Sequence, residues 1–116
     1  MQNIDHILSG LVSSLLPRLT ELVNRKDYSA AMECYDAFRT ADNPAGSVGA
    51  RVHHLAAQAY HGVQDLTGAL KTIRLAQASA EKEADALELA EIFMTLGAIQ
   101  RDRGETRESL RAFTDA

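Results

Sequence analysis

The sequence has few of the residues that hold small proteins together through covalent bonds or metal ions. Among its 116 residues there is one cysteine, Cys34, so an internal disulfide and a cysteine-based metal site are both excluded. Tryptophan is absent, and aromatic residues make up only 5% of the chain. Cys34 lies among apolar residues at helical spacing, so we expect a small core residue and not a reactive thiol.

Basic clusters and catalytic motifs are also missing. Residues 1–58 carry 5 basic and 6 acidic side chains (−1), and residues 59–116 carry 7 and 10 (−3), with no block of Lys and Arg. This balance argues against nucleic acid as a partner. The chain has no glycine-rich phosphate loop and no nucleophile placed beside a base. We therefore expect no catalytic residues and no cofactor.

The amino-terminal segment lacks the features of a targeting signal. No basic residue precedes Arg18, and the apolar stretch before it is too short to cross a bilayer. The sequence therefore predicts a cytoplasmic protein that does not associate with membranes.

Three histidines, His53, His54 and His61, form the only cluster that suggests a metal site. His54 and His61 share a helix face but lie seven residues apart, or about 10 Å along a helix axis. Metal ligands on one helix need a spacing of four residues or less. No carboxylate completes a ligand set locally, so we expect no metal. The carboxylates over residues 81–91 are expected to form a solvated helix start.

The chain is rich in alanine and leucine, and its apolar residues follow a helical periodicity. Apolar residues recur at steps of three and four, and no alternation of period two is long enough for a strand. Turn-forming residues interrupt the pattern, as in Asn43-Pro44 and Gly46. We predict six helices, over residues 3–24, 29–41, 48–62, 66–80, 83–102 and 106–115.

Three of the turns between helices have the same residue pattern, in which an acidic residue follows a polar residue or a glycine. They are Lys26-Asp27, Gln64-Asp65 and Gly104-Glu105. Around each turn, two small or apolar residues lie twelve positions apart, and the units recur with a period of about 40 residues. The pairs are Leu19 with Ala31, Ala57 with Ala69, and Gly97 with Ser109. We expect Gly97 to mark the closest approach of two helices, since a glycine inside a helix otherwise costs about 1 kcal/mol.

This register resembles the tetratricopeptide repeat, W-x2-L-G-x2-Y followed by A-x3-F. The third unit reads Phe93-x2-Leu96-Gly97-x2-Gln100, then Ser109-x3-Phe113-x2-Ala116, and the second reads His53-x2-Ala56-Ala57-x2-Tyr60, then Ala69-x3-Ile73-x2-Ala76. The period is longer than is usual for this repeat, as in the long repeats of kinesin light chains and bacterial peptide-sensing regulators. The resemblance implies an all-α fold, a right-handed α-solenoid of three antiparallel helix hairpins. Its units would span about 3–41, 48–80 and 83–116, as part of a longer array.

The resemblance also implies where a ligand would bind. In this family the first helix of each unit lines a concave surface that holds extended peptides or helices. The matching side chains form one stripe on each helix: Arg51, His54, Gln58 and His61, then Met94, Ala98 and Arg101. We therefore expect a non-catalytic scaffold that binds a protein or peptide. The alternative at these positions is a solvent-facing stripe with no ligand.

Two other functions fit the same pattern. Leu110 and Phe113 lie on the last helix, and no capping helix follows to cover its outer edge. The chain could therefore be a self-association module that forms a homo-oligomer through this edge. It could also be the sensory domain of a larger regulator.

Overall fold

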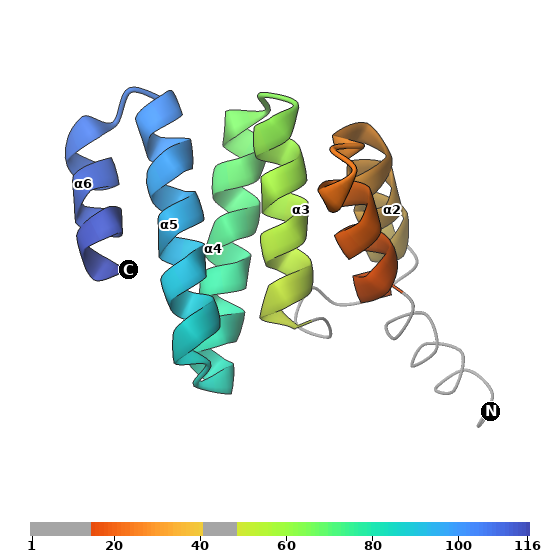
Figure 1. The fold of residues 1–116 in the computed structure, drawn as a ribbon, viewed down its shortest axis with the longest axis horizontal. Helices are drawn as coiled ribbons and strands as arrows, with labels where there is room; N and C mark the ends of the chain where they lie inside the picture. Colours follow the sequence, from red (N-terminus) through yellow and green to blue (C-terminus); the bar gives the residue numbers. More distant parts are fainter. Residues whose placement is uncertain (1–14, 41–48) are drawn as a thin grey trace.

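The computed structural model describes residues 15–40 and 49–116, and these residues form an all-helical fold (Figure 1). Residues 15–24 are helical. They are followed by α2 (Tyr28–Thr40), α3 (Ala50–Gly62), α4 (Leu66–Glu83), α5 (Ala86–Asp102) and α6 (Thr106–Asp115). No strand occurs in the two described ranges, so the all-α prediction is confirmed. The part of the first predicted helix over 3–14 and the break predicted at Asn43-Pro44 and Gly46 lie outside the described residues.

Four turns in the described residues share one backbone geometry. Lys26, Gln64, Ala84 and Gly104 have positive φ angles of 61°, 65°, 54° and 83°. In each turn the next residue donates its backbone N–H to the carbonyl five positions earlier, over 2.8–3.0 Å. This is the Schellman arrangement, which satisfies the last carbonyl groups of a helix. The break between the fourth and fifth helices was predicted at residues 81–82, and the turn lies instead at Ala84-Asp85, which has neither glycine nor proline to mark it.

The start of α5 corrects one predicted boundary. Residue Glu83 ends α4 and does not begin the next helix. The reason is a capping bond, in which Asp85 Oδ1 accepts the backbone N–H of Glu88 at 3.1 Å. Asp65 caps α4 in the same way, through the N–H of Gly68 at 3.0 Å. Aspartate favours this position because its short side chain reaches the free N–H groups of the first turn.

The helices lie side by side, and each one packs against the next in sequence (Figure 1). In addition, α3 contacts α5 directly. One apolar cluster contains side chains of residues 15–24, α2 and α3. A second cluster contains side chains of α3, α4, α5 and α6. Helix α3 belongs to both clusters, and its residues 52–57 are buried without interruption. It is therefore the central helix of the described fold.

The small or apolar residues predicted at the helix contacts are buried. Leu19, Ala31, Ala57 and Ala69 have no exposed surface. Gly97 is buried as well, and a Cβ atom at this position would lie 2.5 Å from the ring of Phe113 on α6. The prediction that Gly97 lies where two helices meet closely is confirmed, and the ring of Phe113 explains why the residue is a glycine.

Candidate functional site

The predicted stripe of α3 faces α5, where acidic and hydroxyl side chains meet it. Three of its four residues, Arg51, His54 and His61, contact side chains of α5. The contacts join residues 34 to 41 positions apart. The stripe is therefore an interface between two helices over much of its length, and only part of it is open to a ligand.

His54 is the buried centre of this interface, with 2% of its surface exposed. Its Nδ1 lies 2.8 Å from Glu88 Oε1, and a carboxylate accepts hydrogen bonds, so Nδ1 carries the proton. Its Nε2 lies 2.7 Å from Thr95 Oγ1 and 3.5 Å from Gln58 Nε2. The hydroxyl of Thr95 and the side-chain amide of Gln58 can both hydrogen-bond with Nε2. Both ring nitrogens are therefore satisfied within the fold.

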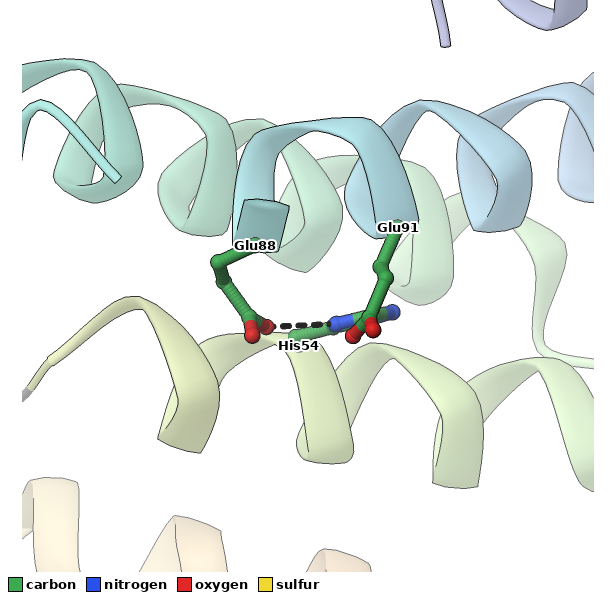
Figure 2. A group of neighbouring side chains, drawn as sticks. All are labelled: His54, Glu88 and Glu91. Atoms are coloured by element: carbon green, nitrogen blue, oxygen red, sulfur yellow. Dashed lines mark hydrogen bonds and ion pairs between the residues drawn. The ribbon is translucent and has the colours of Figure 1, made fainter. Parts of the chain in front are cut away.

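Two carboxylates of α5, Glu88 and Glu91, flank His54 (Figure 2). One ligand atom from each of these three residues lies within 4.8 Å of the other two, an arrangement that a divalent cation could use. The guanidinium of Arg51, however, lies 3.7 Å from Glu88 and 3.4 Å from Glu91. A cation is thus already beside both carboxylates, and Glu88 is hydrogen-bonded to the imidazole. We interpret the cluster as a polar link between α3 and α5.

His61 forms a second link between the same helices. Its Nε2 donates to Asp102 Oδ2 over 2.6 Å. This hydrogen bond lowers the pKa of the Asp102 carboxyl from its ordinary value, and the positive charges of His61 and Arg101 act in the same direction. Partial desolvation of the carboxyl opposes them. The pair holds the carboxyl end of α5 against the end of α3.

The remaining predicted residues differ in their surroundings. Met94 and Arg101 on α5 are exposed, Met94 by 53%, while Ala98 is half-buried. On α6, Leu110 is 63% exposed, whereas Phe113 is half-buried against Gly97. Leu110 is therefore the residue of the predicted interface pair that offers apolar surface.

A hollow of about 550 Å³ opens at the end of this face, and we call it the inner hollow. It brings together side chains from the helical residues 15–24, α2, α3 and α5 and from the turn after α3. Its lining residues are Val23, Tyr28, Gln58, His61, Gly62, Gln64 and Asp102. Two of the seven residues predicted to bind a ligand, Gln58 and His61, belong to it.

Sequence reasoning missed the partners on α5. Glu88 was expected on a solvated face, and this is wrong, because its side chain is 13% exposed and bonded to His54. Thr95 and Asp102 were not considered. The available signal was the repeat itself, since equivalent helices of neighbouring units face each other and His54 then needs an acceptor on α5.

Comparisons with protein-family models, with curated proteins and with solved structures each give no match for this chain. The resemblance to tetratricopeptide repeats therefore stays a prediction. Within the described ranges, no helix combines the length and the apolar character that crossing a bilayer requires.

Proposed function

We propose that the chain is a non-catalytic protein- or peptide-binding module built from tetratricopeptide-like repeats. In this proposal three helix pairs form a right-handed solenoid, and the helical residues 15–24, α3 and α5 line its concave face. The support is a recurring geometry. The same left-handed turn and the same buried pair of small or apolar residues return with a period of about 40 residues.

The observation that carries the proposal is the inner hollow, where side chains of all three inner helices meet. Gln58 presents an amide to it, which can pair with a peptide main chain. Val23 and Tyr28 supply apolar and aromatic surface. Arg101, beside Asp102, is an exposed cation close to the hollow. The best-fitting ligand is an extended peptide with polar and acidic residues.

Peptide-phage selection on the full chain tests this function. Selected peptides should bind at least about tenfold more weakly to Gln58→Leu and to Arg101→Glu, because each change removes a polar contact at the hollow. The matched control is Arg107→Glu, which reverses an exposed charge on α6. The proposal fails if no peptide is enriched, or if all three variants bind the selected peptides equally.

The second candidate function is self-association through α6. The observation that favours it is the 63% exposure of Leu110. The solution mass, measured by sedimentation over a hundredfold range of concentration, separates the two functions. A dimer that dissociates on dilution and that Leu110→Asp abolishes would make α6 the interface. A monomer at every concentration would exclude this candidate.

A further inference from the structure

Helix α5 carries large apolar side chains on the face that it exposes to solvent. The described residues include four large apolar side chains that are exposed, and two of them, Leu87 and Met94, are on this helix. Their exposed fractions are 73% and 53%. The two residues lie seven positions apart, so they share one face and are separated by about two turns. Half-buried Ala98 continues this face one turn later.

Two charged residues complete a regular stripe on the same face. Glu91 and Arg101 are exposed. From Leu87 onward the steps along the stripe are four, three, four and three residues, which is the spacing at which one helix packs along another in a coiled coil. We call this set of residues the α5 stripe: Leu87, Glu91, Met94, Ala98 and Arg101.

The α5 stripe is complementary to itself when two copies of the helix run antiparallel. Glu91 and Arg101 lie at equal distances along the chain from residue 96, and so do Met94 and Ala98. A twofold axis at residue 96 therefore places Glu91 opposite Arg101 of the second copy and Met94 opposite Ala98 of the second copy. Each contact occurs twice, a carboxylate meets a guanidinium, and a large side chain meets a small one.

We propose that the chain forms a homodimer through the α5 stripe, with the two α5 helices antiparallel about residue 96. A parallel pair would instead place Glu91 against Glu91 and Arg101 against Arg101, so like charges would meet. This dimer goes beyond the proposed function, because it needs neither a peptide nor the inner hollow. It also differs from self-association through α6, where Leu110 is the one large apolar side chain that the described residues expose.

The ion pairs that these charged residues form within their own chain leave atoms for the second copy. Arg51 on α3 contacts Oε2 of Glu91 over 3.4 Å, and Asp102 contacts Nε of Arg101 over 3.5 Å. The other carboxylate oxygen of Glu91 and the terminal guanidinium nitrogens of Arg101 can pair across the interface. Exposed ion pairs contribute little individually, so we expect a weak dimer that dissociates on dilution.

The solution mass of the full chain tests the dimer, measured by sedimentation over a hundredfold range of concentration that reaches the millimolar range. Met94→Asp should weaken association at least about tenfold, because it replaces the central apolar contact with a carboxylate on each copy. Leu110→Asp is the matched variant on α6 and should leave association unchanged. Circular dichroism shows whether each variant keeps the helical fold.

Two charge reversals test the antiparallel register. Glu91→Arg places arginine opposite arginine at both pairs, and Arg101→Glu places glutamate opposite glutamate. Each variant alone should therefore associate at least about tenfold more weakly than the native chain. An equal mixture of the two variants should regain the dimer, because every charge then meets its opposite on the other copy.

The proposal is overturned if the native chain is a monomer at every concentration, or if Leu110→Asp abolishes the dimer. A dimer that Met94→Asp does not weaken would also overturn it. Failure of the equal mixture to associate would contradict the pairing of Glu91 with Arg101. The native mass, Met94→Asp and Leu110→Asp remain decisive even if a charge reversal does not fold.

Discussion

Ser109 Oγ donates a hydrogen bond to the carbonyl oxygen of Gly97 over 2.8 Å, and both residues are buried. The bond joins α6 to α5, and the ring of Phe113 covers the same glycine. A side chain at position 97 would occupy the space of that ring. The lost helix propensity of glycine is offset by this close packing.

Gly97→Leu should therefore destabilise the fold by about 1–3 kcal/mol, because the new side chain overpacks the contact between α5 and α6. The measurement is the free energy of unfolding in urea. A double-mutant cycle with Phe113→Ala provides the control. The leucine should cost less when the ring is absent, and strictly additive effects would show that Phe113 is not what excludes a side chain at position 97.

Ala84→Gly should stabilise the fold by about 1 kcal/mol, because glycine adopts positive φ angles without steric cost. Ala84 has a φ of 54°, and the left-handed conformation strains every residue that carries a Cβ atom. Thermal unfolding followed by circular dichroism measures the change. Ala78→Gly is the matched control, because Ala78 lies exposed inside α4, where glycine should lower stability by about 1 kcal/mol. A loss of stability in both variants would contradict the assigned turn.

Asp102→Asn should lower stability at neutral pH and lose this effect in acid. The pKa of Asp102 is lower in the folded protein than its ordinary value of 3.8. Its contribution is therefore complete above that value and is lost as the pH falls through the folded pKa. Urea unfolding at pH 7, 5, 4 and 3 should show the wild type and the variant converging at the lowest pH. Glu33→Gln, which removes an exposed carboxylate, is the control, and a constant difference for Asp102→Asn would contradict the role of His61.

Glu88→Leu should cost about 1–3 kcal/mol, because it leaves the buried Nδ1–H of His54 without its acceptor. Glu91→Leu is the matched control. It removes an exposed partner of Arg51, and surface ion pairs contribute less than about 1 kcal/mol. Chemical denaturation of both variants measures the contrast. Equal costs would mean that the hydrogen bond to His54 contributes no more than the surface pair does.

Local features of the chain were predictable, and contacts between distant helices were not. The helices and three of the turns follow from periodicity and from turn residues, which act within a few positions. The break between α4 and α5 was predicted a few residues too early, because an alanine at position 84 gives no signal of a left-handed turn. The pairing of His54 with Glu88 depends on how α3 and α5 are placed against each other. The period of the repeat suggests that α3 and α5 are neighbours, but it does not fix which of their side chains meet, so a stripe predicted to be open is partly an interface.

The two neighbouring histidines of α3 form hydrogen bonds with two different helices. His53 hydrogen-bonds to Tyr35 on α2 over 2.7 Å, with the rings edge to face, and His54 hydrogen-bonds to Glu88 on α5. One helical turn is thus shared by both apolar clusters. Separation of α2 or of α5 from the rest of the fold would break one of these polar contacts of α3. We therefore expect the cooperative unit of unfolding to extend from α2 to α5, and we expect the amides of α3 to exchange most slowly with solvent within it.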